Sequence, residues 1–210
     1  MSTALVKYTP IRRDTPAEYP CPPLDDVDNP PVPIHPYLYN LDCPISWDVR
    51  MNLRNNARRI ASDERLSTIA LKANAISAAG MNHNLMKIMI SDELFPWTIT
   101  IKREAGLKVG DILMDIGVSL NIEVTDSERW IADPERVQRA EASREANQGT
   151  GAVRIRPAKD VMRRVDWLGN KTKFAGLVHS SAKEYQSLVR RRVHSQDRSN
   201  AWVMIVEERD

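Results

Sequence analysis

The stretch from Leu85 to Leu120 constrains the fold of this chain more than any other part of the sequence. Its first half contains two runs in which every second residue is apolar, Met86-Ile88-Ile90 and Trp97-Ile99-Ile101. A period of two places each apolar set on one face of a β-strand. Because only a short Pro-ended segment separates the two runs, we expect them to pair as an antiparallel hairpin with a longer loop.

After Gly106 the apolar period changes from that of a strand to that of a helix. One stripe with helical spacing contains Val109, Ile112, Leu113, Ile116 and Leu120. Lys108 stands where a Ser or Thr cap would be expected, but Asp111 in the first turn suits the helix dipole. We therefore expect a helix that buries its stripe on the inner face of the hairpin.

Other segments predict strands and helices around this unit. Residues 47–54 alternate apolar and polar side chains, which is typical of a half-buried strand, and residues 66–76 have the apolar spacing of a short helix. Residues 171–180 predict another strand. The run Ala201–Glu207 is apolar without alternation, which suits a central strand that is covered on both sides.

Capping signals predict where three further helices begin. Thr125–Glu128 and Ser181–Glu184 both fit the capping box, and Asp133-Pro134 supplies a cap followed by proline at the first helical position. The helix that follows Asp133, over residues 135–148, is mostly charged, so we expect it to project into solvent. The helix after Ser181 has an apolar stripe and ends in three arginines, which suit the C-terminal end of a helix.

These elements predict a single two-layer α+β domain, in which helices pack on a mostly antiparallel sheet of about five strands. Ten of the thirteen prolines fall within the first 44 residues. Proline fixes φ and removes a backbone donor, so neither a helix nor a central strand can run through that region. We therefore expect residues 1–34 to be an extended or disordered arm and residues 35–210 to be the domain.

Positive charge is concentrated in the C-terminal third. Residues 152–193 contain eleven basic and three acidic residues, although the whole chain has a net charge of only +2. Residues 1–44 have the opposite sign, with three basic and six acidic residues. The leading hypothesis is a non-enzymatic module that binds another protein through this basic third. The candidate partner-binding residues are Arg163, Arg164, Lys171, Lys173, Arg190, Arg191 and Arg192.

Nucleic-acid binding is an alternative use of the same charges. Arg163, Arg164 and Arg190–Arg192 could neutralise phosphates, and Trp167, Phe174 or Tyr185 could stack on bases of RNA or single-stranded DNA. Against this alternative, the net charge is small and no pattern of the common nucleic-acid-binding modules accompanies the arginines.

A hydrolase-type enzyme is the second alternative. His179 could act as a base toward Ser180, Ser181 or Cys43, but no nucleophile motif flanks any of them. Asp166 could be a carboxylate with a shifted pKa in a pocket, although the Gly-Asn pair that follows it indicates a tight turn.

No cofactor or metal ion is expected. The four histidines are scattered, and no glycine-rich phosphate-binding loop occurs. We interpret Trp47, Trp97, Trp167 and Trp202 as core side chains rather than as a cofactor site.

An intracellular location, cytoplasmic or nuclear, is expected. No apolar run approaches the roughly 18–20 residues that span a bilayer, so we expect no membrane attachment. The N-terminus lacks the basic start and apolar block of a secretory signal. Two cysteines, Cys21 and Cys43, in a chain of this size favour reduced thiols.

Four short segments of this chain have the order and spacing of motifs that recur together in a known family. They are His35-Pro36-Tyr37-Leu38, Trp47-Asp48-Val49-Arg50, Pro96-Trp97-Thr98-Ile99, and Asp166-Trp167-Leu168-Gly169 with Phe174-Ala175-Gly176-Leu177. The set resembles a large domain family of unknown function, abundant in mushroom-forming fungi, with HP-L, WD-R, PW-I and D-L-G-T-F-GL motifs. The resemblance covers residues 35–207, and the charged helix at 135–148 and the segment 181–199 depart from it. It implies an intracellular fungal protein, and it implies no activity, cofactor or catalytic residue.

Overall fold

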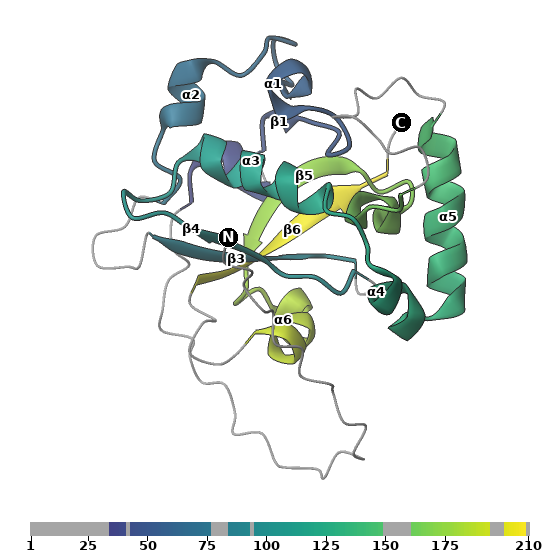
Figure 1. Ribbon diagram of the computed structural model, residues 1–210. Coiled ribbons are helices and arrows are strands. Elements are labelled where there is room, and N and C mark those ends of the chain that lie inside the picture. Colours follow the sequence, from purple (N-terminus) through teal and green to yellow (C-terminus); the bar gives the residue numbers. More distant parts are fainter. Residues whose placement is uncertain are drawn as a thin grey trace, which may run out of the picture. The chain divides into compact units, whose positions relative to one another are not determined.

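The computed structural model describes residues 34–40, 43–76, 84–92, 95–148, 161–193 and 200–208. The predicted arm lies outside these ranges except for Ile34, so the domain boundary stays a prediction. Figure 1 shows the elements, which in chain order are η1 (Pro36–Leu38), β1 (Ile45–Ser46), α1 (Leu53–Asn56), β2 (Arg58–Arg59), α2 (Thr68–Lys72), β3 (Leu85–Ile90), β4 (Ile99–Lys102), α3 (Val109–Leu120), α4 (Asp126–Ile131), α5 (Pro134–Gln148), η3 (Arg164–Leu168), β5 (Lys173–His179), η4 (Lys183–Tyr185), α6 (Gln186–Arg192) and β6 (Ala201–Glu207).

Four strands form one mixed sheet in the order β4-β3-β6-β5 (Figure 1). β3 is antiparallel to β4, with Ile88 opposite Ile99, and parallel to β6, which is antiparallel to β5. The short strands β1 and β2 form a separate two-stranded sheet. The α+β class is therefore confirmed. The expected single, mostly antiparallel sheet of about five strands is matched in part: two of the three pairings in the sheet are antiparallel, but it has four strands, because the strand predicted over residues 47–54 does not form.

That strand is replaced by a turn that the side chain of Asp48 closes. Its carboxylate accepts the backbone N–H of Arg50 at 3.0 Å, and the N–H of Met51 donates to the Asp48 carbonyl at 2.9 Å. Residues 47–49 then lie beside the start of β5, where the Phe174 N–H donates to the Trp47 carbonyl at 2.9 Å. Apolar and polar residues do alternate over residues 47–54, but the backbone turns after Val49 and then enters α1.

The strand–strand–helix unit predicted from residues 85–120 is confirmed. β3 pairs with β4, and α3 spans Val109–Leu120 with its apolar stripe buried in the same core cluster as Ile88 and Ile99. The Asp111 carboxylate accepts the backbone N–H of Lys108 at 3.1 Å. Asp111 therefore satisfies a backbone donor at the helix start, which the lysine side chain cannot do.

The two faces of the four-stranded sheet are covered by different elements. Along β6, Trp202 and Met204 belong to the main core cluster with α3, whereas Ala201 and Val203 belong to a second cluster with α6. Because successive side chains of a strand point to opposite faces, α3 and α6 lie on opposite sides of the sheet. We call these sides the α3 face and the α6 face. The prediction that β6 is covered on both sides is confirmed, and α6 adds a layer that the two-layer prediction lacked.

The expected helix over residues 66–76 is shorter than predicted. α2 spans only Thr68–Lys72, and Ile69, a member of the predicted apolar stripe, is 85% exposed. The capping box expected at Ser181 does not form, because Ala182 is the N-cap of η4 and the Ser181 hydroxyl contacts His179 instead.

α5 begins as predicted but does not project into solvent. The Asp133 carboxylate accepts the N–H of Glu135 at 2.9 Å, which confirms the cap. Ala140 is buried, and the Ser143 hydroxyl donates to the Gly169 carbonyl at 3.1 Å. This mostly charged helix therefore packs on the core through Ala140 and partly buried Val137, and it makes a polar contact with the residue after η3.

Candidate interaction surface

The fold divides the candidate cations between different elements. Arg163 and Arg164 lie at the start of η3, whose Val165 and Leu168 are part of the core of the α3 face. Lys171 and Lys173 lie just before and at the start of β5. The three arginines at 190–192 form the last turn of α6 on the opposite face of the sheet.

Arg164 is built into a cluster of aromatic and acidic side chains. Its guanidinium carbon lies 4.9 Å from the centroid of the Trp97 ring, and its Nη2 lies 3.4 Å from Oε1 of Glu128. The indole N–H of Trp97 donates to the same Oε1 at 2.7 Å, and the Trp97 ring meets Trp167 edge to face at 5.4 Å. With only 20% of its side chain exposed, Arg164 contributes mainly to the fold.

The same cluster keeps Glu128 ionised. Burial alone would raise the pKa of this carboxyl, but hydrogen bonds from Thr125 and from the Trp97 indole, with the charge of Arg164, hold the pKa below its ordinary value. The backbone N–H of Thr125 donates to Oε2 at 2.8 Å, which completes the predicted capping box of α4.

The other candidate cations near η3 and β5 are Arg163, Lys171 and Lys173. The guanidinium of Arg163 donates to the Asn121 side chain at 3.0 Å, and its backbone N–H donates to buried Asp166 at 2.9 Å. Lys173 lies 3.9 Å from the Glu207 carboxylate. Lys171 is exposed. Asp166 therefore closes the start of η3, and Gly169, with φ of +64°, supplies the left-handed residue of the predicted turn.

α6 has an apolar inner side and a basic outer side. Leu188 and Val189 are buried in the second cluster, together with Val203 of β6. Arg190 and Arg191 are exposed, and Arg192 is half-buried. The Arg191 Nε donates to the Ser187 carbonyl one turn earlier, at 3.3 Å, so this guanidinium lies along the helix surface.

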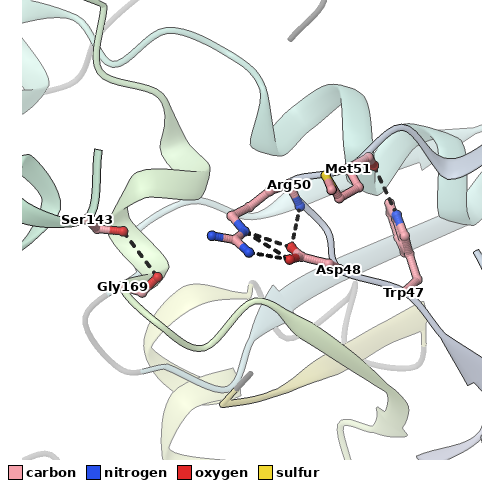
Figure 2. A network of polar contacts seen from close by, with 6 residues as sticks. All are labelled: Trp47, Asp48, Arg50, Met51, Ser143 and Gly169. Atoms are coloured by element: carbon pink, nitrogen blue, oxygen red, sulfur yellow. Dashed lines mark hydrogen bonds and ion pairs between the residues drawn. The ribbon is translucent and has the colours of Figure 1, made fainter. Parts of the chain in front are cut away.

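The Asp48–Arg50 ion pair is a structural contact beside the start of β5. Figure 2 shows the guanidinium of Arg50 facing the Asp48 carboxylate, while the Trp47 indole N–H donates to the Met51 carbonyl at 3.1 Å. The two charged side chains are only 10% and 20% exposed. Burial would raise the pKa of Asp48, but the hydrogen bonds and charge of Arg50 hold that pKa below its ordinary value.

The four segments that carry the family resemblance contact one another. Trp47 accepts the backbone hydrogen bond of Phe174 described above, and Trp97 packs on Trp167. Gly176 has φ of +110°, and a Cβ there would lie 2.6 Å from the Cα of Asn40, so only glycine lets the η1 segment pass so close to β5. These segments hold the fold together, as expected for core tryptophans; Trp47, Trp167 and Trp202 are buried and Trp97 is partly buried.

The groups considered for catalysis are held in local contacts. The Nδ1 of His179 lies 2.8 Å from the Ser181 hydroxyl, and the Ser181 backbone N–H points at the same nitrogen at 3.3 Å, an arrangement typical of a turn closed by a side chain. Burial raises the pKa of the Cys43 thiol, which disfavours the nucleophilic thiolate. His83, His194 and Cys21 lie outside the described residues.

Neither a metal site nor a membrane-spanning helix is found in the parts of the chain that the structure describes. No group of three or more histidine, cysteine or acidic side chains is arranged to hold a metal ion there. Across the same ranges, no helix is both long and apolar enough to cross a bilayer.

Trp130 of α4 is 90% exposed and is followed by Ile131 at 63% exposed, although no pattern in the sequence marks either residue. The capping box at Thr125 fixed where this helix begins. It could not show which side of so short a helix faces the core, so the exposure of Trp130 had no signal in the sequence.

Comparison with known protein families identifies the domain family of the chain. A family model described as "Family of unknown function (DUF6699)" matches residues 45–187. No curated protein and no solved structure matches the chain. The family description names neither an organism nor an activity, so the fungal setting, the cellular location and the partner stay predictions.

Proposed function

The chain belongs to the DUF6699 family, whose function is unknown, and we propose that it is a non-enzymatic protein-interaction module that binds an acidic partner through α6. The observation that carries this proposal is the exposed pair Arg190 and Arg191 on a helix whose inner side is fixed in the core. Arg164, by contrast, is held between Trp97 and Glu128. α6 therefore carries two neighbouring exposed arginines on a helix that is packed on the core.

Charge complementarity identifies the chemistry of the partner. Arginine donates to carboxylates in a planar fork that suits bidentate pairing. Arg190 carries such a fork, and Arg191, whose Nε donates to the Ser187 carbonyl, places a second positive charge on the same turn. A partner segment rich in Asp or Glu would satisfy both. Lys171 could extend the contact only if the partner also reaches the start of β5.

The nucleic-acid alternative has less support. Of the three aromatic residues considered for stacking on bases, Trp167 and Phe174 are 7% and 1% exposed, so their rings are not available. Tyr185 is half-buried and packs against the second cluster, so only part of its ring could meet a base. Arg163 and Arg164 lie on the opposite face of the sheet from α6. One nucleic-acid strand could contact both the η3 arginines and the α6 arginines only by crossing the edge of the sheet. Each set of arginines alone would make few phosphate contacts.

A charge-reversal pair tests the proposal. Arg190→Glu/Arg191→Glu should weaken binding of a fluorescent polyglutamate peptide by about tenfold or more, because two charge-assisted contacts become repulsive. The matched control is Arg59→Glu/Arg139→Glu, which changes the net charge equally at exposed positions on β2 and α5. Affinity purification of cellular partners with the same two variants should show partners lost only with the α6 change.

The same titrations include generic single-stranded RNA and duplex DNA at low and physiological salt. Binding to either tighter than about micromolar at physiological salt would favour the nucleic-acid alternative. Equal loss of polyglutamate binding in both charge-reversal variants would mean that net charge, and not α6, attracts the partner.

A further inference from the structure

α4 is fixed in place on two of its sides. Glu128 accepts the indole N–H of Trp97 at 2.7 Å, which ties the helix to the loop before β4. One residue later, Arg129 pairs with Glu141 of α5 at 2.7 Å. Successive helical residues point about 100° apart, so these two contacts leave a third side of the helix facing solvent.

Trp130 and Ile131 occupy the open part of this helix. The Trp130 side chain is 90% exposed and that of Ile131 is 63% exposed. Two large apolar side chains in solvent on a short helix would be unremarkable if the helix were loosely attached. Here the helix is anchored by Glu128 and Arg129, so the backbone that carries the exposed indole is held in place.

The charges around this pair are acidic. Residues 123–135 contain Glu123, Asp126, Glu128, Asp133 and Glu135 but a single basic residue, Arg129, which is already paired. The acidic side chains of Glu123, Asp126, Asp133 and Glu135, which are close to Trp130 in the sequence, are exposed, with Asp126 fully so, whereas Glu128 is half-buried in its contacts with Trp97 and Arg164. A partner would therefore meet an apolar centre with a negatively charged rim.

We propose that Trp130 and Ile131 form the centre of a second docking surface, which takes a partner protein segment carrying an apolar side chain flanked by lysine or arginine. The charge complementarity of the acidic rim selects the basic flanks. An exposed indole also attracts cations over its face, and burying it removes a large apolar area from water. Because α4 is anchored in the free protein, little conformational freedom is lost on binding.

This surface differs from the α6 surface in both place and sign. α6 would take an acidic segment, whereas α4 would take a basic one. The two proposals can therefore fail independently, and a variant that alters one surface serves as a control for the other.

The test uses the full chain and three labelled peptides of equal length, composed of lysine and leucine, lysine and serine, or glutamate and leucine. Fluorescence anisotropy at physiological salt should show the lysine–leucine peptide binding most tightly. Trp130→Ala should weaken that binding by about tenfold, as for a residue at the centre of an interface. Ile69→Ala removes an apolar side chain that is 85% exposed on α2 and should leave the binding unchanged.

Two further variants separate the contributions. Trp130→Phe keeps an aromatic face and should retain most of the affinity. Asp126→Asn/Glu135→Gln neutralises part of the rim and should weaken binding by about threefold. Arg190→Glu/Arg191→Glu should not weaken binding of the lysine–leucine peptide. Circular dichroism should show that Trp130→Ala unfolds at the wild-type temperature, because the indole makes little contact with the fold.

Three outcomes would overturn the proposal. In the first, Trp130→Ala binds the lysine–leucine peptide as tightly as the wild type does. In the second, the lysine–serine peptide binds as tightly as the lysine–leucine peptide, so that charge by itself explains the binding. Alternatively, sedimentation could show that the wild type self-associates and Trp130→Ala does not. In that case the occupant is a second copy of this chain and not a basic partner.

Discussion

The two faces of the four-stranded sheet are covered to very different extents. Among the described residues, the core cluster on the α3 face has thirty buried members, drawn from elements as distant in sequence as η1 and β6. The cluster on the α6 face has six, and α6 is only seven residues long. Because burial of apolar surface is the main favourable contribution to folding, most of the stabilising free energy lies on the α3 face.

The contacts of charged side chains also differ between the two faces. On the α3 side, Arg103 pairs with Asp115 at 2.7 Å and Arg164 with Glu128 at 3.4 Å, and each pair joins two elements. On α6, Arg190 and Arg191 point away from the core. The comparison indicates that one side of the sheet builds the fold, whereas the other carries a surface that can change with little cost in stability.

The largest expected effect comes from deleting the same side chain on each face. Leu113 and Leu188 are 0% and 3% exposed. Leu113→Ala should lower the free energy of unfolding by about 4 kcal/mol, and Leu188→Ala by about 2 kcal/mol. The smaller loss is expected because the short helix α6 can shift to fill the cavity that the deleted side chain leaves, whereas α3 cannot. Denaturant unfolding of both variants measures the difference. Equal losses would break the comparison.

A smaller effect is expected from two neighbours on β4 that point to opposite faces. Ile99 is buried on the α3 face, whereas Thr100 is exposed. Ile99→Ala should cost about 3 kcal/mol. Thr100→Ala should cost about 0.5 kcal/mol or less, as for surface positions generally. A Thr100→Ala cost near that of Ile99→Ala would mean that the α6 layer extends across β4.

The smallest effect concerns the acid dependence of stability. The pKa of Glu128 is lowered in the folded protein, so its ionised form stabilises the fold above the ordinary glutamate pKa, and this contribution is lost as the pH falls through the folded pKa. Glu128→Gln should therefore lose less stability than the wild type between about pH 7 and about pH 3. Identical acid profiles would show that the contacts to Trp97 and Arg164 do not govern this carboxyl.

The parts of the fold that were predictable are those where apolar periodicity decides the structure. The stripe from Val109 to Leu120 and the two strands before it follow from spacing alone. The segment after Trp47 shows where spacing fails, because its apolar pattern is that of a strand while the Asp48 carboxylate closes a turn. A side chain that redirects the backbone leaves no periodic signal.

The candidate surface was less predictable than the fold. The density of arginine after residue 152 indicated a basic third, but the sequence could not show that η3 and α6 lie on opposite faces of the sheet. It also could not show that Arg164 is held between Trp97 and Glu128, because those partners lie 67 and 36 residues away in the chain. Which cations stay exposed is decided by tertiary contacts.

Native-state hydrogen exchange tests most directly whether the fold is built on the α3 face. The Ile116 amide lies in the middle of α3, and the Val193 amide donates to the Val189 carbonyl at 2.9 Å at the end of α6. We predict that Ile116 exchanges only through global unfolding, whereas Val193 exchanges about tenfold or more faster through local opening of α6. Equal protection of the two amides, with both following the global free energy of unfolding, would contradict the account.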